Sequence, residues 1–467
     1  MLDLKSVDRA RAEFHAAFPD IDLAELDDLR ATEYARLDDQ SHVYLDYTGA
    51  GLYATSQLRE HSTLLEQALL GNPHSTNPTS NAAAAFAERA RASVLEFFNA
   101  SADEYTVALT PNATGALKLV GEAYPFEPDS RLVLTADNHN SVNGIREFAR
   151  AAGTPVTYVP LEQADLRVDP AAVDAALQPV APGKHALFAY PAQSNLSGVQ
   201  HPLEWIPLAR RRGWDVLLDA AASVPTNRLD VDRWQPDFVA VSFYKIFGYP
   251  TGIGCLIARR SALARLRRPW FSGGTIDIVS VSLDAHAMRP DEAGFEDGTI
   301  NFLGLPAVEI GLRYIQAADI DAVHARVQAL TEWLLERMAA LRHPNGAPVV
   351  QLYGPTNMRQ RGGTVAFNVL TPDGEVVDYH RVEQAAGEWN ISLRGGCFCN
   401  PGAAEAALEL TPALLRTAFS GSGEQSRHAW GMVRVSLGIA TTPADICRLI
   451  EFLTAWPGGG GRNRSDG

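Results

Sequence analysis

The chain has 467 residues, of which 46% are hydrophobic and 20% are charged, and its formal net charge is −15. This composition is typical of a globular protein that is large enough to bury a sizeable core and to form two lobes. The negative charge argues against a nucleic-acid partner, which needs a basic surface, and no apolar run approaches the ~18 residues of a membrane-spanning helix.

The N-terminal sequence MLDLKSVDRARAEF is charged and amphipathic, and it lacks the apolar stretch of a signal peptide. The cysteines are too few and too unevenly placed for a disulfide scaffold; they are Cys255, Cys397, Cys399 and Cys447. We therefore expect a cytoplasmic protein.

The first part of the chain, to about residue 40, is expected to be helical, because apolar residues recur there near helical spacing. These residues are Ile21, Leu23, Leu26 and Leu29. From Val43 to about Ala258, short apolar runs alternate with amphipathic segments. The expected strands are 43–47, 105–110, 131–136, 154–160, 185–191, 214–220, 238–243 and 253–259, and the expected helices include 80–98, 114–123, 143–152 and 203–212. This alternation predicts an α/β fold with a mostly parallel sheet, helices on both faces, and ligands at the carboxyl ends of the strands.

The pattern changes from about Leu303, where a long helical stretch runs to about Leu341. The strand-like runs VVQLYG, TVAFNVL and MVRVSLG follow, with helices between them, and predict a second, smaller α+β domain. We divide the chain into a helical segment that packs on the small domain, a large domain, a small domain and a disordered tail. Their limits are 1–40, 41–305, 306–456 and 457–467.

Lys245 follows an apolar strand in the segment VSFYKIFGYPTGIG. Most lysines are solvated surface charges, but apolar and aromatic side chains surround this one. Burial lowers the pKa of a lysine and makes its amine a usable nucleophile and proton carrier.

Two more polar side chains stand at strand ends. Asp219 ends the strand in WDVLLDAAAS, where a carboxylate must be paired or hydrogen-bonded, either to a protonated ring nitrogen or, alternatively, as a helix N-cap. His139 in TADNHNSV is a candidate for stacking on a ring, although a lone histidine is more often structural.

The segment LTPNATGALKLV places Asn112, Ala113 and Thr114 where a turn opens a helix, so that N–H groups and the Thr114 hydroxyl are available to an anion. No nucleotide-binding glycine motif accompanies it. A lysine, an acid, a ring-stacking group and an anion cradle are the four demands of pyridoxal 5′-phosphate, which we expect to be held as a Schiff base on Lys245.

Several longer segments resemble the class V aminotransferase and cysteine desulfurase family, and most closely the N-terminal aminotransferase-like domain of molybdenum cofactor sulfurases. They are YLDYTGAGLY, GNPHSTNPTS, DNHNSVNGIREF, YPAQSNLSG, LLDAAAS, SFYKIFGYPTGIG, FEDGTINFL and RGGCFCNPGA. The resemblance implies the fold of the fold-type I pyridoxal-phosphate-dependent transferases.

The resemblance also implies roles for individual residues. Lys245, Asp219 and His139 match the cofactor's lysine, its ring-nitrogen partner and its stacking histidine, while Thr114 and Ser242 match phosphate-binding positions. Asn195 matches an asparagine near the cofactor and substrate, and Arg434 matches the arginine that grips a substrate α-carboxylate. The loop 273–275, with Thr275, corresponds to one that reaches the phosphate of the partner subunit, so a homodimer is expected.

The loop RGGCFCNPG carries Cys397 and Cys399. In desulfurases, a loop cysteine takes sulfur from L-cysteine as a persulfide and alanine is released; by motif match this residue is Cys399. A thiolate suits an exposed, electropositive loop, and Arg394 is near in sequence. The alternatives are half of a metal site, which no second cluster completes, a strained disulfide, or two buried structural cysteines. No metal is expected.

The leading interpretation is therefore a pyridoxal-phosphate-dependent cysteine desulfurase-type sulfurtransferase that passes sulfur to a protein or small-molecule acceptor. A lyase, aminotransferase or epimerase with incidental cysteines, and a non-catalytic sulfur-relay scaffold, are the alternatives. Two departures from the sulfurases stand out: PGAAE replaces a further cysteine after CFCN, and the chain ends soon after VRVSLG, so we expect no C-terminal acceptor domain.

Overall fold

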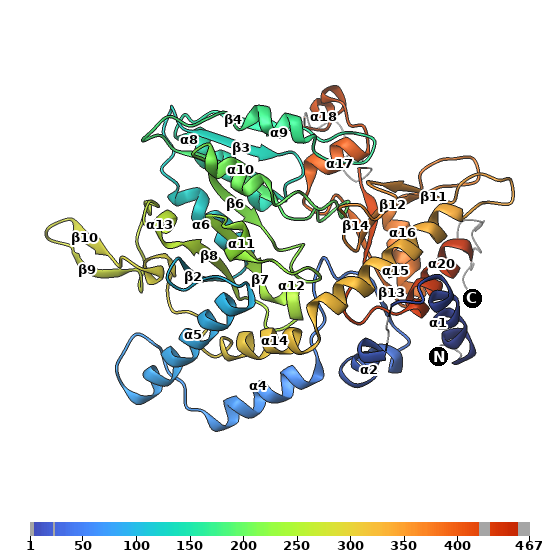
Figure 1. Cartoon of the computed structure of the whole chain (residues 1–467), viewed down its shortest axis with the longest axis horizontal. Coiled ribbons are helices and arrows are strands. Elements are labelled where there is room, and N and C mark those ends of the chain that lie inside the picture. Colours follow the sequence, from blue (N-terminus) through green and yellow to red (C-terminus); the bar gives the residue numbers. More distant parts are fainter. Residues whose placement is uncertain (1–3, 22–23, 420–429, 456–467) are drawn as a thin grey trace, which may run out of the picture.

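The computed structural model describes residues 4–21, 24–419 and 430–455. A seven-stranded sheet forms one half of the molecule, and a four-stranded sheet with its helices forms the other (Figure 1). The predicted tail 457–467 and Leu23 lie outside the described residues.

The large sheet has the strand order β2-β8-β7-β6-β5-β3-β4. Its strands are β2 (Tyr105–Thr110), β3 (Arg131–Thr135), β4 (Val156–Val159), β5 (Ala186–Pro191), β6 (Asp215–Asp219), β7 (Phe238–Ser242) and β8 (Gly254–Arg259). β8 is antiparallel to β2 and β7, and all other neighbouring strands of this sheet are parallel. The mostly parallel sheet is thus confirmed, and the strands begin and end within two residues of their predicted limits.

Successive side chains of these strands enter two different cores. In β5, Phe188 and Tyr190 join one core, whereas Leu187 and Ala189 join the core on the opposite face. Both faces are buried because helices cover both, which is why the strands appear in the sequence as continuous apolar runs. The helices of the first face include α5 (Pro78–Phe97), α10 (Trp205–Arg211) and α14 (Pro306–Ala317), and those of the second include α6 (Ala113–Ala123), α8 (Ile145–Ala151) and α13 (Arg260–Leu263).

The second half is built on an antiparallel sheet of order β11-β12-β15-β14. Its elements are α15 (Ile320–Ala340), β11 (Val350–Tyr353), β12 (Thr364–Val369), α16 (Tyr379–Glu388), β13 (Ile391–Ser392), β14 (Arg394–Gly396), α17 (Pro401–Ala407), α18 (Pro412–Phe419), β15 (Met432–Ser436) and α20 (Pro443–Ala455). The helical stretch expected over 303–341 is two helices, because the chain turns at Asp319, whose φ is +54° and whose side chain caps α15 by accepting from Asp321 N–H.

The predicted strand 43–47 differs from expectation. Only Val43–Tyr44 (β1) is a strand, and it pairs with β13 and not with the large sheet. Beyond β1 the chain runs beside β15: the N–H of Ser436 donates to the carbonyl oxygen of Leu45 at 2.7 Å. The apolar pattern had predicted a strand here, but its partner comes from the far end of the chain and is not visible in the local sequence.

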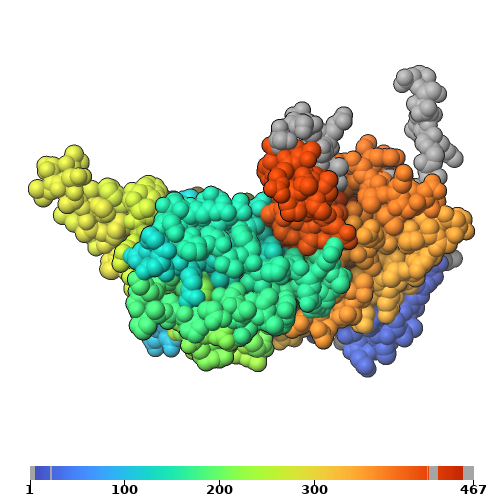
Figure 2. Space-filling view, turned by 90° about the horizontal axis from the view of Figure 1, so that it is seen from above, coloured from blue at the N-terminus to red at the C-terminus, as the bar shows by residue number. Residues whose placement is uncertain are grey.

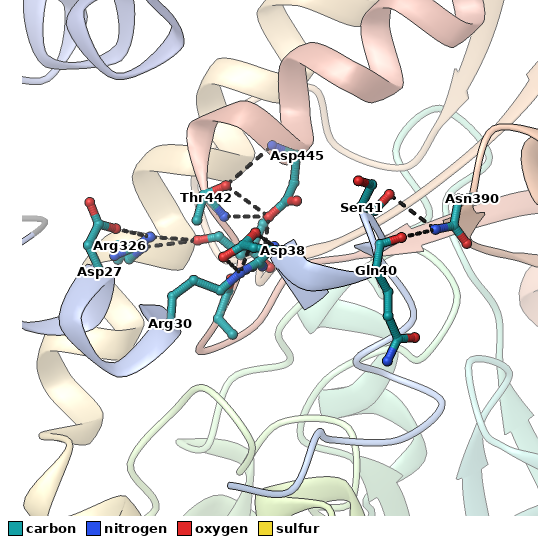
Figure 3. Close-up of polar contacts among 11 residues, drawn as sticks. Asp27, Arg30, Asp38, Gln40, Ser41, Arg326, Asn390, Thr442 and Asp445 are labelled. Atoms are coloured by element: carbon teal, nitrogen blue, oxygen red, sulfur yellow. Dashed lines mark hydrogen bonds and ion pairs between the residues drawn. The ribbon is translucent and has the colours of Figure 1, made fainter. Parts of the chain in front are cut away.

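The N-terminal helices α1 (Leu4–Ala17), α2 (Ala24–Glu33) and α3 (Arg36–Asp39) lie beside α15 and α20 (Figure 1). Ion pairs of two buried arginines, Arg30 and Arg326, join these parts (Figure 3). Arg30 pairs with Asp445 at 3.2 Å and with Asp38 at 2.7 Å, and Arg326 pairs with Asp27 at 2.7 Å. Arg30 and Arg326 also donate to carbonyl oxygens of Ala440 and Thr441, in the loop that follows β15.

A hairpin of β9 (Ile276–Ser280) and β10 (Ala285–Met288) projects from the large-sheet half (Figures 1 and 2). It exposes apolar side chains, with Val281 98% and Leu283 77% exposed. The remaining elements are α4 (Thr55–Gln67), α7 (Asn140–Asn143), α9 (Pro170–Ala176), α11 (Val231–Trp234), α12 (Phe243–Phe247) and η1 (Glu292–Phe295). None of the described helices combines the length and apolarity needed to cross a membrane.

Candidate active site

A cavity lies at the carboxyl ends of β5, β6 and β7, where a parallel sheet is expected to bind its ligand. Residues from the start of α6 and of α12 also line it. It brings together most of the residues singled out from the sequence: Ala113, Thr114, His139, Asn195, Asp219, Ser242 and Lys245.

Lys245 reaches the cavity from α12, a short helix that begins directly after β7. Phe243 and Phe247 of this helix are buried and stacked on each other, which holds the helix in place. Burial lowers the pKa of the Lys245 amine, and the Asp219 carboxylate opposes this effect. Within the described part of the chain, no partner holds this amine in a hydrogen bond or ion pair, so it is available to a ligand in the cavity.

Asp219 is the last residue of β6 and is 8% exposed. Its Oδ1 accepts the N–H of Ala221 at 3.0 Å. Residues 221–226 form turns and not a helix, so the alternative N-cap role is not realised. Among the described residues the neutral N–H of Ala221 is the one hydrogen-bond donor to the Asp219 carboxylate, which can therefore still accept a cationic N–H group.

His139 caps the short helix α7. Its Nδ1 accepts the N–H of Ser141 at 3.1 Å, which leaves the proton of the neutral ring on Nε2. Burial lowers the pKa of His139, while Asp219 opposes this shift, so the ring is neutral at neutral pH. A neutral, half-buried imidazole beside Lys245 and Asp219 is suited to contact with an aromatic ring.

An anion cradle faces these groups at the start of α6. The Asn112 side chain caps the helix, and Ala113 N–H donates to Ser242 Oγ at 2.8 Å. Because the Ser242 hydroxyl accepts this bond, its own proton remains available for donation to an anion. Thr114 Oγ1 lies 2.8 Å from Ser141 Oγ, which adds two hydroxyls at the positive end of the helix dipole. The free lysine, buried acid, imidazole and cradle together fit pyridoxal 5′-phosphate.

The cysteine loop lies against this cavity. Asn195 Nδ2 donates to the carbonyl oxygen of Phe398 at 2.7 Å, and Asn140 N–H donates to that of Cys399 at 2.7 Å. Both Cys397 and Cys399 are exposed. Phe398 and Cys399 have φ values of +54° and +56°, which non-glycine residues rarely adopt, so the surrounding contacts hold the loop in a strained turn.

The two arginines singled out from the sequence are neighbours across a strand pair, with Arg394 on β14 opposite Arg434 on β15. Arg434 is buried, donates from Nη1 to the carbonyl oxygen of Asn195 at 2.9 Å, and lies 4.7 Å from the centre of the Phe398 ring. Both guanidinium groups contact the carboxylate of Asp46.

Four predicted site residues do not line the cavity: Arg394, Cys399, Arg434 and Thr275. Cys399 and Arg434 are hydrogen-bonded to residues at the cavity, whereas Thr275 is bonded within its own loop. Thr275 is fully buried, and its hydroxyl donates to the carbonyl oxygen of Ser272 at 2.9 Å. That the loop 273–275 reaches a partner subunit stays a prediction.

Sequence reasoning missed several polar residues of the site. Asn400 donates to Asp137 at 2.7 Å and to Oδ1 of Asn195 at 3.0 Å, and Gln193 lines the cavity. Asp46 was also missed, although it stands in the quoted segment YLDYTGAGLY, where an acidic residue in an apolar run was an available signal. Its partners come from the other end of the chain and could not be inferred locally.

The fold resembles that of solved cysteine desulfurases. One from Thermococcus onnurineus NA1 superposes with a TM-score of 0.76 at 24% identity, over 91% of this chain and 96% of that one. One from Escherichia coli superposes with a TM-score of 0.72 at 21% identity, over 91% of this chain and 96% of that one. The predicted fold class is thereby confirmed.

Closer similarity in sequence is found to longer proteins. The chain is 36% identical over 476 residues to the molybdenum cofactor sulfurase of Arabidopsis thaliana, with 92% of this chain and 58% of the relative covered. The identity to that of Homo sapiens is also 36%, over 456 residues, with 92% and 51% covered. The chain thus spans a little over half the length of these curated relatives. The family profile described as aminotransferase class-V matches residues 43–449. The resemblance seen in the sequence motifs is confirmed, and the chain belongs to the class V aminotransferase family.

Proposed function

We propose that this protein is a pyridoxal-phosphate-dependent cysteine desulfurase-type sulfurtransferase, which takes sulfur from L-cysteine onto Cys399 and releases alanine. The observation that carries the proposal is the link between two sites: the cavity of Lys245, Asp219 and His139 is tied through Asn195 to the loop of Cys399. The similarity to molybdenum cofactor sulfurases supports the same reaction.

Four groups of the cavity are assigned to the cofactor. Lys245 would carry it covalently, Asp219 would accept the N–H of its ring nitrogen, and His139 would lie against its ring. Ala113, Thr114 and Ser242 would hold its phosphate at the start of α6. When bound, pyridoxal 5′-phosphate withdraws electrons from an attached amino acid and loosens the bonds at its α and β carbons.

The residues of the chain supply binding and proton transfer. Arg434 would hold the substrate α-carboxylate; it donates to the main chain of Asn195, which lines the cavity. Burial lowers the pKa of the Lys245 amine, which makes its Nζ better suited to give and take a proton.

Cys399 is the proposed sulfur acceptor. Its thiolate forms an S–S bond with the substrate sulfur while the substrate C–S bond breaks; the electron pair of that bond stays with carbon, which takes up a proton. L-cysteine and the Cys399 thiol are thereby converted to alanine and a Cys399 persulfide. Exposure of Cys399 suits the following step, in which the persulfide must reach an acceptor.

The exposed hairpin and the free cysteines bear on the oligomeric state and the cellular compartment. We infer a homodimer, since the hairpin next to the loop 273–275 exposes the apolar side chains of Val281 and Leu283. For Thr275 to bind the phosphate of the other chain, its hydroxyl would have to leave the carbonyl oxygen of Ser272. All four cysteines are free, which supports a reducing, cytoplasmic compartment. The sulfur acceptor is a protein or a small molecule.

Product analysis tests the proposal. The purified holoprotein, incubated with L-cysteine and a reductant, is expected to yield alanine and sulfide in equal amounts, and Lys245→Ala is expected to abolish both together with the visible absorbance of the cofactor. Formation of pyruvate, a keto acid or the D-isomer, without sulfide from cysteine, would instead identify a lyase, aminotransferase or epimerase. Absence of the visible band in the wild type would mean a scaffold.

A further inference from the structure

Asp46 lies between two arginines, Arg394 and Arg434, and pairs with both. Its Oδ1 accepts from Arg434 Nη2 at 2.8 Å, and its Oδ2 accepts from Arg394 Nε at 3.0 Å and from Nη2 at 2.5 Å. The three side chains differ in exposure: that of Arg434 is 3% exposed, that of Asp46 11% and that of Arg394 49%.

The backbone holds this carboxylate firmly in place. The residues on either side of Asp46 are bonded to β15, with Ser436 N–H donating to Leu45 O and Thr48 N–H donating to Ser436 Oγ at 2.8 Å. At Gly49, a Cβ atom would stand 2.5 Å from Asp46 Oδ2 and 2.7 Å from Arg394 Nη2. Only glycine leaves room for the ion cluster at this position.

Arg434 is not saturated by these contacts. Its Nη1 donates to the main chain of Asn195 and its Nη2 to Asp46, while Nε is buried and finds no acceptor among the described residues. A buried guanidinium N–H without an acceptor is costly, and an added carboxylate would satisfy it. The cluster therefore retains donor capacity for an anion that the protein does not itself supply.

The ion cluster of Asp46, Arg394 and Arg434 has a formal net charge of +1. Two guanidinium groups and one carboxylate leave a single uncompensated positive charge, which one substrate carboxylate neutralises. With Asp46 neutral, two positive charges would stand in this half-buried site, and its field would favour an anion of higher charge.

We infer that Asp46 is a positioning and specificity-determining residue. It orients Arg434 and makes the site prefer amino acids with a single carboxylate over those with a second acid group in the side chain. This inference rests on the proposed function, because it takes Arg434 to be the group that binds the substrate carboxylate. Asp46 does not touch the reacting atoms; it acts through the two arginines. Selectivity arises because a second acid group on the substrate meets the Asp46 charge, which costs binding free energy.

The test compares the affinities of the holoenzyme for L-alanine and for L-aspartate, read from the change in cofactor absorbance. In Asp46→Asn, the ratio of the two dissociation constants, aspartate over alanine, is expected to fall at least about tenfold. The double variant Asp46→Asn/Arg394→Gln removes one charge of each sign and is expected to restore the ratio toward that of the wild type. Asp321→Asn, at an exposed ion pair with Arg228, is the matched control for loss of one negative charge.

Arg394→Gln alone provides a second arm, should Asp46→Asn fail to fold. Because Arg394 is half exposed, its loss is tolerable, and it leaves the cluster with no net charge. The affinity for alanine is then expected to fall and the ratio to rise at least about tenfold. The inference would be overturned if Asp46→Asn and Arg394→Gln both kept the wild-type ratio of dissociation constants and the wild-type affinity for alanine. No absorbance response to any amino acid in the wild type would instead contradict the proposed function.

Discussion

Asn195 donates through Nδ2 to the carbonyl oxygen of Phe398 at 2.7 Å, and this bond joins the cavity of Lys245 to the loop of Cys399. Asn400 reinforces it by donating to Oδ1 of Asn195 at 3.0 Å. A loop with two residues at positive φ needs such contacts to keep one conformation. In the proposed reaction, the position of Cys399 would therefore depend on the amide side chain of Asn195, which takes no chemical part itself.

Asn195→Ala is expected to slow formation of the Cys399 persulfide by about 10- to 100-fold, because loss of positioning by about 1 Å has effects of this size. Cofactor absorbance is expected to remain. The rate is measured in a single turnover with L-cysteine, with Asn81→Ala as a control on the exposed side of α5. A persulfide rate equal to that of the wild type would show that the loop does not depend on Asn195.

Asp219→Asn is expected to weaken cofactor binding by about 10- to 100-fold, because the bond from a charged ring N–H to a carboxylate is replaced by a neutral one. Dialysis followed by titration with pyridoxal 5′-phosphate measures the change. Asp215→Asn, at the opposite end of β6, serves as the control. Equal affinities in Asp219→Asn and the wild type would remove Asp219 from the cofactor site.

The lowered pKa of Lys245 predicts a pH dependence of stability in the cofactor-free protein. Between its native pKa and the ordinary value of 10.5, the unfolded chain binds the proton and the folded chain does not, so Lys245 makes stability rise with pH in that window. Below the native pKa, the full cost of burying the charge is present.

Lys245→Met is therefore expected to be more stable than the wild type at neutral pH, and the difference is expected to shrink as the pH rises toward 10.5. Urea unfolding of the cofactor-free proteins at a series of pH values measures it. The exposed Lys118, changed to Met, provides the comparison. If the stability advantage of Lys245→Met instead grew with pH, the folded protein would favour the protonated form of the Lys245 amine, which contradicts the lowered pKa.

The buried pair of Arg30 and Asp445 is expected to fix the N-terminal helices to α20 (Figure 3). Arg30→Met leaves the Asp445 carboxylate buried without its cation, which typically costs about 3–5 kcal/mol of unfolding free energy. The double variant Arg30→Met/Asp445→Leu is expected to recover much of this loss, since no buried charge remains unpaired. Chemical unfolding measures both, and an equal loss in single and double variants would contradict the role of the ion pair.

The large sheet could be predicted from the sequence because each of its strands is recognisable from its own short stretch of residues. Each strand is a short, mostly apolar run with both faces buried, such as RLVLT at 131–135. Lys245 and Asp219 stand at strand ends, where such sheets bind ligands. The motif resemblance then supplied Asn195 and Arg434, which composition and spacing alone would not have identified.

The parts that could not be predicted depend on long-range pairing. The sequence pattern placed strand 43–47 in the large sheet, yet residues 43–46 lie against β13 and β15, from the far end of the chain. Asp46 acquires its role only through that pairing, because Arg394 and Arg434 are distant in sequence. The break at Asp319 was missed for a different reason: the apolar periodicity continues through it, while a single residue at positive φ redirects the chain.

The most direct measurement of the central claim is the mass of the peptide that contains Cys399 after one turnover of the holoprotein with L-cysteine in the absence of a reductant. The account predicts one added sulfur atom on Cys399, alanine equal to the chains that reacted, no added sulfur in Cys399→Ser, and retention of the modification in Cys397→Ser. Full alanine formation in Cys399→Ser, with the added sulfur found on Cys397 or on no residue, would contradict it.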